Sequence, residues 1–464
     1  MTSAFRIILL ALSLQQTSWA QAERTRQQIP NLDSLPDVTV QLQTQIDRND
    51  GNLVLAGAEQ FRITKPLVFD LTKVGAAVAK ATGGATLVMH GPGPALRFIG
   101  SHEGTASPLS FKPATWNERM PIVAGIEILG AHPLADGIEL QRTVEATITQ
   151  VAVRWCRHGI HLLDRNRNVT VSDCHLYENT GIGVFLNDVN LHQINVSNSH
   201  VSYNRGGGIV VRDGNVRNLQ VTGCDIEGNM PADETPTKTA NVLIDVSGSA
   251  DDRSKSIAEV SITGCTIQHS ANYSGSEDRT TAPGGANIRL AGKQSYPINS
   301  VTISGNVLSD TTVSVDVNYA HDIAINSNNF FAPKPQNLRV ANSQRVVVNG
   351  NTFNPRQFVR PGTISFTNCA DCILSSSTLH RFATPDGAVI LDHCSGFLLN
   401  TLNLSDCGSG IVLRHTSNTT ITNCRVTRMA DGGTSISAGE SNSNILLNGN
   451  AFAADSDIAD GAVK

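Results

Sequence analysis

One short phrase repeats along most of the chain and constrains its fold more than any other feature. Two apolar or β-branched residues stand two positions apart, two small or polar residues follow, and a Cys, Ser or Asn usually closes the phrase. The closing positions form a column of thirteen residues: Ala131, Cys156, Cys174, Ser199, Cys224, Cys265, Asn306, Asn328, Asn351, Ser377, Leu402, Cys424 and Asn450. Neighbours in this column are 22 to 26 residues apart, except for 18 between Cys156 and Cys174 and 41 on either side of Cys265.

Such a pattern predicts a parallel β-coil. Alternation with a period of two indicates strands, and a repeat of 20–30 residues indicates a solenoid. One turn cannot bury its apolar face alone, so stacked turns bury a continuous core between them. We expect the column residue to lie at a tight bend, where Asn amides hydrogen-bond up the stack and small Cys or Ser side chains point inward.

With this column, the sequence resembles the right-handed parallel β-helix superfamily, which includes pectate lyases, polygalacturonases, alginate lyases and phage tailspikes. The resemblance covers roughly residues 30–452. It implies an all-β, single-stranded, right-handed parallel β-helix with a short N-terminal capping helix. The predicted organisation is a signal peptide (1–20), a leader (21–37), an N-terminal cap with the first coils (38–124), regular coils (125–453) and a flexible tail (454–464). Within the cap region, 90–121 is predicted to be a long loop.

The N-terminus has the pattern of an export signal. Arg6 precedes an apolar run from Ile7 to Leu14, and Ser18-Trp19-Ala20 has the small-x-small form of a cleavage site. This indicates a secretory signal peptide, with an uncleaved anchor as the alternative. We therefore predict a secreted or periplasmic protein whose mature chain does not enter a membrane, because no later stretch approaches the ~20 apolar residues of a membrane span.

The net charge and the cysteine content limit the kinds of partner and cofactor that we expect. A formal net charge of −5 and a pI near 6.2 argue against nucleic acid as a partner. Of nine cysteines, the five in the column are predicted to be buried structural thiols. Metal ligation by Cys369 and Cys372, a C-x-x-C pair, is the alternative for those two. The sequence identifies no cofactor, leaves a Ca²⁺ requirement open and does not define the oligomeric state.

In the enzymes that this sequence resembles, the catalytic residues lie on the strand that comes after the column turn in each coil. The outward positions of this strand are therefore the candidate site. Alternation predicts two outward rows. The first row is Glu139, His161, Gly183, Val210, Leu243, Arg289, Ser314, Arg339 and Ser365. The second row is Gln141, Leu163, Phe185, Arg212, Asp245, Ala291, Asp316, Ala341 and Thr367. The longest connections flank the strands of Asp245 and Arg289, which predicts a groove between the 225–240 and 266–287 loops.

Three interpretations of the charged positions stay open. Asp245 and Asp316, predicted to be two coils and roughly 9.6 Å apart, would suit an inverting hydrolase. Alternatively, Arg212, Arg289 and Arg339 would neutralise a uronate carboxylate while a nearby base abstracts a proton, which is β-elimination. The third interpretation is a solvated face of weak ion pairs.

Further candidates come from neighbouring positions. Glu139 and His161 are predicted to be adjacent and could form an acid–base pair, while Phe185, Tyr203 and Tyr273 are the predicted sugar-binding aromatic residues. The polygalacturonase motifs, an Asp-Asp at a strand start and a Gly-His-Gly, do not occur on these strands. The segment Leu391-Asp392-His393-Cys394 is similar to the Ile-Asp-His pattern of pectate lyases, but it falls outside the predicted groove.

The sequence as a whole predicts an exported β-helix protein that acts on a polysaccharide. A lyase of an acidic, uronate-containing glycan is the favoured activity. The alternatives are an inverting glycoside hydrolase and a non-catalytic carbohydrate-binding or surface structural protein.

Overall fold

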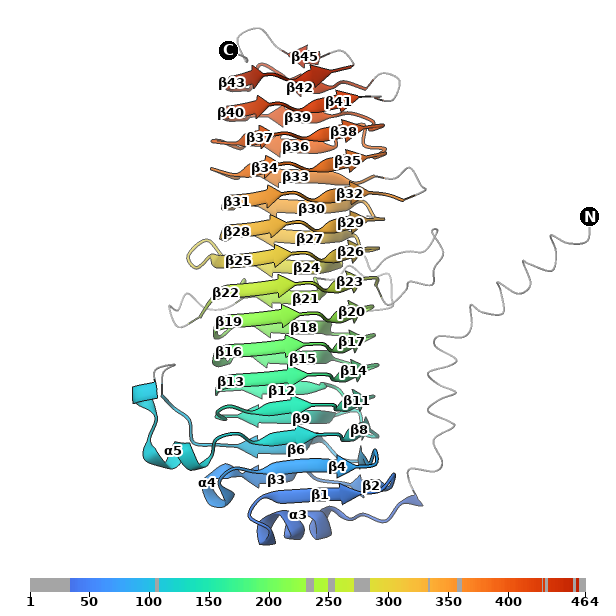
Figure 1. The fold of residues 1–464 in the computed structure, drawn as a ribbon, viewed down its shortest axis with the longest axis vertical. Coiled ribbons are helices and arrows are strands. Elements are labelled where there is room, and N and C mark those ends of the chain that lie inside the picture. Colours follow the sequence, from blue (N-terminus) through green and yellow to red (C-terminus); the bar gives the residue numbers. More distant parts are fainter. Residues whose placement is uncertain are drawn as a thin grey trace, which may run out of the picture.

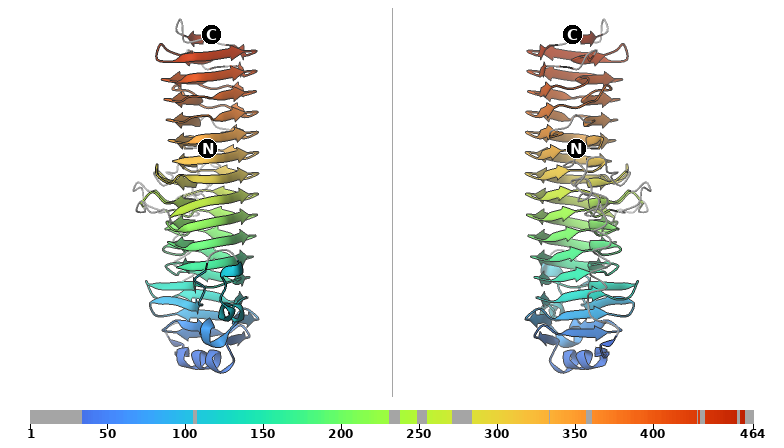
Figure 2. Two further views of the ribbon diagram at one scale, coloured as in Figure 1. Left: turned by 90° about the vertical axis from the view of Figure 1, so that its left-hand side faces the viewer. Right: turned by 90° about the vertical axis from the view of Figure 1, so that its right-hand side faces the viewer.

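A computed structural model describes residues 34–104, 108–230, 238–248, 255–270, 284–332, 334–356, 361–427, 429, 433–453 and 456–458. The expected signal peptide, most of the expected leader and Tyr273 lie outside these residues. The described chain winds into a right-handed parallel β-helix, a long stack of coils with α3 (Thr39–Arg48) at one end (Figure 1). Two further views show the same straight stack from its sides (Figure 2).

Each coil contributes one strand to each of three parallel sheets of fifteen strands. Sheet 1 consists of β1 (Asn52–Ala56), β4 (Val78–Thr82), β7 (Ile122–Ala124), β10 (Thr147–Thr149), β13 (Arg165–Ser172), β16 (Asn190–Ser197), β19 (Asn215–Thr222), β22 (Ser256–Thr263), β25 (Ile298–Ser304), β28 (Ala320–Asn326), β31 (Gln344–Asn349), β34 (Ile373–Ser375), β37 (Leu398–Asn400), β40 (Ser417–Thr422) and β43 (Ser443–Asn448). Sheet 2 consists of β2 (Gln60–Ile63), β5 (Thr86–Met89), β8 (Glu127–Gly130), β11 (Ala152–Arg154), β14 (His175–Tyr177), β17 (His200–Ser202), β20 (Asp225–Glu227), β23 (Thr266–Gln268), β26 (Val307–Ser309), β29 (Asn329–Phe331), β32 (Thr352–Asn354), β35 (Thr378–His380), β38 (Asn403–Ser405), β41 (Arg425–Thr427) and β44 (Ala451–Phe452). Sheet 3 consists of β3 (Leu67–Asp70), β6 (Gly93–Ile99), β9 (Ala135–Gln141), β12 (Ile160–Leu163), β15 (Ile182–Asn187), β18 (Gly207–Arg212), β21 (Ala240–Asp245), β24 (Ala286–Ala291), β27 (Val313–Asn318), β30 (Gln336–Ala341), β33 (Thr363–Thr367), β36 (Val389–Asp392), β39 (Ile411–Arg414), β42 (Ile436–Ala438) and β45 (Ser456–Ile458).

The predicted column from Cys174 to Asn450 lies at the corner between sheets 1 and 2. The preceding residue has a positive φ, which explains the glycines at Gly223, Gly264 and Gly305. At most positions of the column, the backbone N–H donates to the side chain one coil on, as in Cys265 N to Asn306 Oδ1 at 2.9 Å. The column was predicted correctly here. At a sharp corner the backbone groups lose their sheet hydrogen bonds, and the column side chains replace them, which is why polar or small residues recur at this position.

The first two predicted members do not belong to this corner. Ala131 and Cys156 follow strands β8 and β11 of sheet 2, so they lie between sheets 2 and 3. The step of 18 residues between Cys156 and Cys174 is therefore a change of corner rather than a short coil.

A second asparagine ladder occupies the corner between sheets 2 and 3 and continues onto the first residues of sheet 3. Its members are buried and bond side chain to side chain at 2.7–3.1 Å: Asn179, Asn204, Asn229, Asn241 and Asn287. Asn179, Asn204 and Asn229 repeat every 25 residues, but the sequence analysis followed only the other corner, and beyond Asn229 the steps change to 12 and 46 residues. The ladder holds the connections that lead into the candidate strands.

The cysteines are buried free thiols, and none of the nine side chains is exposed by more than 3%. Burial raises the pKa of Cys174 to about 11 and that of Cys372 to about 12, so these thiols stay protonated at neutral pH. The five column cysteines therefore lie inward, as predicted. Cys369 and Cys372 also point into the core, where Cys372 donates to a backbone carbonyl.

The capping helix α3 closes the N-terminal end of the core. Leu42 and Ile46 are buried on one face of the helix, and the Gln43 side chain both accepts from Val68 N and donates to Val68 O. The edge of strand β3 is thereby satisfied by a side chain instead of by another coil, which protects an otherwise open sheet edge.

Two predicted irregular segments are more regular than expected. Strand β6 lies inside the 90–121 segment, which also contains a short 3₁₀ helix (Pro108–Ser110) and α5 (Pro113–Asn117). A further short helix, α4 (Leu71–Val74), follows β3. At the C-terminal end, β45 extends sheet 3 into the predicted flexible tail by pairing with β42. Proline- and glycine-rich composition suggested a loop at 90–95, but sheet 3 accommodates Pro94 because it lies at the start of a strand.

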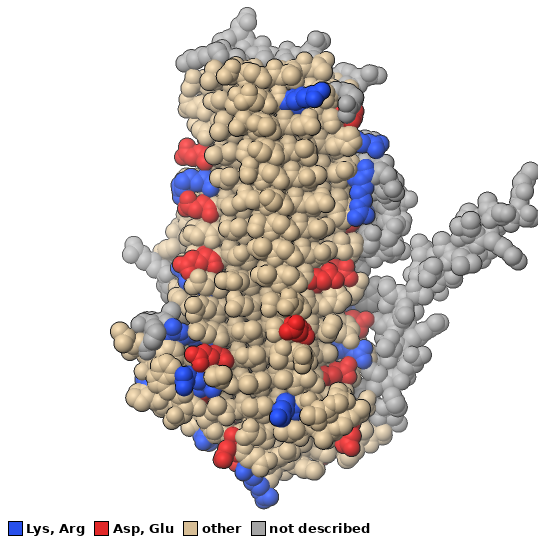
Figure 3. Space-filling view, viewed as in Figure 1, with Lys and Arg blue, Asp and Glu red and all other residues tan. Residues whose placement is uncertain are grey.

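One outer face of the β-helix stands out by its low number of charged side chains (Figure 3). The face toward the viewer in Figure 3, over which sheet 1 lies, carries few charged side chains, and these gather along its two edges. Along the described residues, no helix is long and apolar enough to cross a membrane.

Candidate functional site

The outward side chains of sheet 3 carry most of the predicted site, in a register that differs from the prediction at two strands. One outward row has this order of paired residues: Arg97, Glu139, His161, Phe185, Val210, Leu243, Arg289, Asp316, Arg339 and Ser365. The other has Asn187, Arg212, Asp245, Ala291 and Asn318.

Phe185 and Asp316 therefore belong to the first row, and their prediction in the second row was wrong. Strand β15 is aligned by its buried Val184, which pairs with Ile160, and not by the glycine that precedes the strand. In the same way, Val315 of β27 pairs with Ile288. A slip of two residues keeps the inward and outward faces unchanged, so the hydrophobic pattern could not reveal it.

Because of this register, Asp316 lies between two arginines. Arg339 donates to both of its carboxylate oxygens at 2.8 and 2.7 Å, and Arg289 Nε donates to Oδ2 at 2.9 Å. Burial raises the pKa of Asp316, but hydrogen bonds and charge from Arg339 and Arg289 outweigh burial and lower it below its ordinary value. We call Arg289, Asp316 and Arg339 the arginine–aspartate triad. Its carboxylate is a poor proton donor.

Arg289 also forms hydrogen bonds with the ends of the two long connections that lead into strands β21 and β24. Its guanidinium donates to the carbonyl oxygens of Thr239 and Gly284, which precede strands β21 and β24, and its side chain is 9% exposed. Asp245 lies in the other row and accepts hydrogen bonds from the backbone N–H and hydroxyl of Ser247. The triad thus has the partners of a structural anchor, and Asp245 is not part of it.

Nearer the N-terminus of sheet 3, two imidazoles and a phenyl ring pack against one another. The ring of His161 stacks on Phe185 with 5.0 Å between centroids and 6° between planes, and His158 lies 5.2 Å from His161 and 5.1 Å from Phe185. We call these three residues the imidazole cluster. The guanidinium of Arg212 lies 5.5 Å from the Phe185 centroid and is exposed.

Burial sets the protonation of both imidazoles. It lowers the pKa of His158 to about 4 and also lowers the pKa of His161, so both rings are neutral at neutral pH. The Nδ1 atom of His158 accepts a hydrogen bond from Ile182 N at 3.2 Å. By contrast, Nδ1 of His161 is buried and has no hydrogen-bond partner. Its Nε2 lies 3.4 Å from the Asn187 amide.

A buried carboxylate supports the cluster from the coil below. Asp136 is 1% exposed and accepts from Arg157 at 2.9 and 2.6 Å and from His158 N at 3.0 Å. This places a second, half-exposed guanidinium beside the imidazoles. The sequence analysis missed Asp136 and Arg157. Asp136 is the second residue of β9 and Arg157 lies in the turn before β12, and neither belongs to the two outward rows that the sequence analysis followed.

The predicted Glu139–His161 pair is adjacent in the sheet but is not a hydrogen-bonded dyad. Glu139 pairs with His161 through the backbone, while its carboxylate accepts from Arg97 Nε at 2.6 Å. Phe185, predicted as a sugar-stacking ring, is 5% exposed and lies between the imidazole and the guanidinium. Its place is therefore that of a support for His161 and Arg212.

Tyr203 lies apart from the imidazole cluster, in a hollow on the outer side of sheet 2. The hollow has a volume of about 350 Å³ and is lined by Ala152, His175, Tyr177, Glu178, His200, Ser202 and Tyr203. Tyr203 donates to Glu227 at 3.3 Å and is 47% exposed. The sequence analysis predicted Tyr203 as a sugar-binding residue but none of the other residues that line this hollow, because it followed the strands of sheet 3.

Comparisons with known proteins agree with the architecture. Residues 131–255 match a family model described as "Right handed beta helix region", and residues 258–461 match one described as "Periplasmic copper-binding protein (NosD)". A search of curated protein sequences finds no match.

Similar solved structures include the A-module of the mannuronan C-5 epimerase AlgE6 of Azotobacter vinelandii, at 12% identity over 90% of this chain and 95% of that chain, with a TM-score of 0.49. Gene product 12 of bacteriophage phi29 has 13% identity over 92% of this chain and 55% of that chain, with a TM-score of 0.49. The DFA-IIIase of Arthrobacter chlorophenolicus A6 has 11% identity over 82% of this chain and 93% of that chain, with a TM-score of 0.43.

These structural likenesses carry no activity over to this chain. The family matches, the three parallel sheets and the corner ladder do agree with one another. The chain belongs to the right-handed parallel β-helix superfamily.

Proposed function

We propose that the protein is an exported enzyme that cleaves an acidic, uronate-containing polysaccharide by β-elimination on the outer face of sheet 3. The observation that carries this proposal is the imidazole cluster, where two neutral imidazoles lie beside the guanidiniums of Arg157 and Arg212. A neutral imidazole accepts protons, and an arginine binds a carboxylate through two parallel hydrogen bonds.

In the proposed reaction, Arg212 binds the uronate carboxylate and withdraws its negative charge, which acidifies the proton on the neighbouring ring carbon. His161 takes this proton at Nε2, the imidazole nitrogen that lies 3.4 Å from the Asn187 amide and has the lone pair. The electron pair forms a carbon–carbon double bond, and the glycosidic oxygen on the next carbon leaves and takes up a proton. Since His161 is 8% exposed, its ring must turn outward to meet the sugar.

Two positioning contacts favour His161 as the proton acceptor. Phe185 stacks on its ring, and the Asn187 amide lies next to Nε2. In that contact the Asn187 side-chain N–H donates to Nε2, so Nε2 carries the lone pair and Nδ1 carries the ring proton. His158 is bound at Nδ1 by a backbone N–H, so its Nε2 carries a proton and suits hydrogen-bond donation to the substrate.

The hydrolase alternative has less support. An inverting hydrolase needs a protonated carboxyl group and, across the sugar, an ionised one that activates water. Asp316 is ionised, but its two oxygens accept three hydrogen bonds from Arg289 and Arg339, which makes it a poor base. Asp245 lies in the other row and binds Ser247. Export is supported by the N-terminal apolar segment of the sequence and by the match of 258–461 to a family described as periplasmic.

The test is a panel of uronate and neutral polysaccharides. A rise in ultraviolet absorbance from the new double bond supports elimination. Reducing ends without that rise would indicate hydrolysis, and binding without cleavage would indicate the non-catalytic alternative. Either of these two outcomes overturns the proposed reaction.

Variants locate the site. Arg212→Ala and His161→Ala should each lower kcat/KM about a hundredfold or more, as expected for the loss of one electrostatic or acid–base contribution. Arg345→Ala is the matched control, because this exposed arginine forms its ion pair with Asp322 on sheet 1. If all three variants keep the parent activity, the site lies elsewhere.

A further inference from the structure

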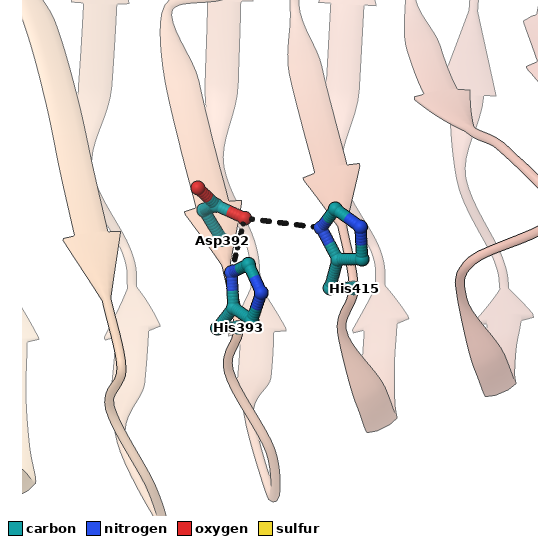
Figure 4. A group of neighbouring side chains, drawn as sticks. All are labelled: Asp392, His393 and His415. Carbon is teal, nitrogen blue, oxygen red and sulfur yellow. Dashed lines mark hydrogen bonds and ion pairs between the residues drawn. The ribbon is translucent and has the colours of Figure 1, made fainter.

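Two histidines and an aspartate meet at a corner near the C-terminal end of sheet 3, far from the imidazole cluster. Asp392 ends strand β36 and His393 follows it, while His415 follows β39 on the next coil (Figure 4). Asp392 pairs with Arg414 across the sheet, so the residues after them are stacked one coil apart. Seven coil steps of ~4.8 Å separate β15 from β36, or about 34 Å.

Both imidazoles present the same nitrogen to one carboxylate oxygen. His393 Nδ1 lies 2.8 Å and His415 Nδ1 3.5 Å from Asp392 Oδ1 (Figure 4). The two rings stack with 4.4 Å between centroids, and the three ligand atoms all lie within 4.8 Å of one another. This convergence follows from the backbone, since both histidines have positive φ values of 53° and 48° and so leave the corner in the same direction.

The three side chains can adjust to an ion. The His393 and His415 side chains are 56% and 58% exposed and Asp392 is 31% exposed, so rotation of the rings meets little packing. Tetrahedral coordination at metal–ligand distances of about 2.0–2.2 Å holds donor atoms roughly 3.4 Å apart. The contact of His415 Nδ1 with Asp392 Oδ1 at 3.5 Å already has this length, whereas His393 Nδ1 at 2.8 Å has to move slightly away from that oxygen. The exposed side leaves a coordination position for water.

We propose that Asp392, His393 and His415 bind one divalent transition-metal cation, of the class of Zn²⁺ or Cu²⁺. Two imidazole nitrogens and one carboxylate oxygen are donors that this class prefers, whereas Ca²⁺ and Mg²⁺ prefer oxygen donors alone. The site is independent of the proposed lyase activity.

A second group of possible ligands, His200, Asp225 and Glu227, is less suited. It offers a single imidazole, and its Glu227 carboxylate already accepts from Tyr203 and Gln268 at 3.3 and 3.4 Å. Both groups contain a histidine–aspartate contact that must open before an ion binds, His393–Asp392 at 2.8 Å and His200–Asp225 at 2.9 Å.

Titration calorimetry with Zn²⁺ tests the proposal on the full-length mature protein, without an affinity tag and after dialysis against a chelator. We expect one saturable site per chain. The His393→Ala and His415→Ala variants should each weaken it by more than about tenfold, since the loss of a direct ligand should cost at least what the loss of a supporting contact costs. Circular dichroism and thermal unfolding should match the parent, because both side chains are exposed.

His380→Ala is the matched control. This exposed imidazole also faces a carboxylate, Asp406 at 3.3 Å, and belongs to the same end of the β-helix. Its loss should leave Zn²⁺ binding unchanged. With Cu²⁺, electron paramagnetic resonance should report nitrogen ligands in the parent and fewer in His415→Ala. Absence of saturable Zn²⁺ binding, or equal binding by the parent and the His393→Ala, His415→Ala double variant, would overturn the proposal. A site that is lost in His200→Ala instead would do the same.

Discussion

Replacing Asn328 by alanine should destabilise the protein more than almost any other removal of a single amide group. Its side chain, 2% exposed, lies in the corner column between sheets 1 and 2 and makes four hydrogen bonds. Its Oδ1 accepts from the backbone N and the Nδ2 of Asn306 at 2.9 and 3.0 Å. Its Nδ2 donates to Ile303 O at 3.0 Å and to Asn351 Oδ1 at 3.1 Å.

The expected loss of stability depends on which hydrogen-bond partners of Asn328 keep another hydrogen bond. Asn306 Nδ2 also donates to Ile262 O, and Asn351 Oδ1 also accepts from Asn328 N, so neither loses all its partners. The Asn306 N–H and a lone pair of the Ile303 carbonyl would be left without this side chain in a buried place. At about 1–3 kcal/mol for each of these two buried polar groups, the free energy of unfolding should fall by about 2–6 kcal/mol.

The comparison is made by thermal unfolding at one scan rate, together with unfolding rates in denaturant, because a long solenoid need not unfold in two states. Asn195→Ala is the control, as this asparagine is exposed on β16 of the same sheet. Surface changes of that kind usually stay within about 0.5 kcal/mol. If Asn328→Ala costs no more than Asn195→Ala, the ladder does not stabilise the corner and the argument fails.

Three further outcomes follow from the same geometry. Cys224→Asn should be nearly neutral, since Asn fits this column, whereas Cys224→Lys should prevent stable folding by burying an unpaired charge; thermal unfolding distinguishes them. Arg289→Ala should lower stability by about 2–3 kcal/mol, because Asp316 keeps only one arginine, while the exposed Arg345→Ala should cost less than about 1 kcal/mol. His158 has a folded pKa of about 4, below its ordinary 6.5, so the unfolded chain binds protons first. Stability should therefore be constant above pH 6.5 and fall between pH 6.5 and 4, and His158→Gln should make that fall shallower in pH-dependent melting curves.

The fold could be predicted from the sequence because its information is periodic and redundant. Each coil repeats the corner phrase, and an error at Ala131 or Cys156 changes nothing in the other eleven positions of the column. The second ladder, from Asn179 to Asn287, carries the same chemistry, but only its first three members repeat at 25 residues, and the next two steps are 12 and 46 residues. The first ladder was recognisable because two alternating apolar residues precede most of its members.

The site could be predicted only to the level of a face. Hydrophobic alternation assigns an outward direction to His161, Arg212 and Asp316, and in the structure all three lie on the outer face of sheet 3. Which of them touch depends on register, and a shift of two residues leaves every inward and outward assignment intact while moving Asp316 from the row of Asp245 to a place beside Arg289. That shift turns a candidate proton donor into the centre of an ion-pair anchor. The supporting contacts of the imidazole cluster come from Asp136, at the start of β9, and from Arg157, in the corner before β12, where no alternation constrains the direction of a side chain. A corner residue acquires its neighbours from the stacking of whole coils, so its chemistry becomes readable only when the register of the coils is known.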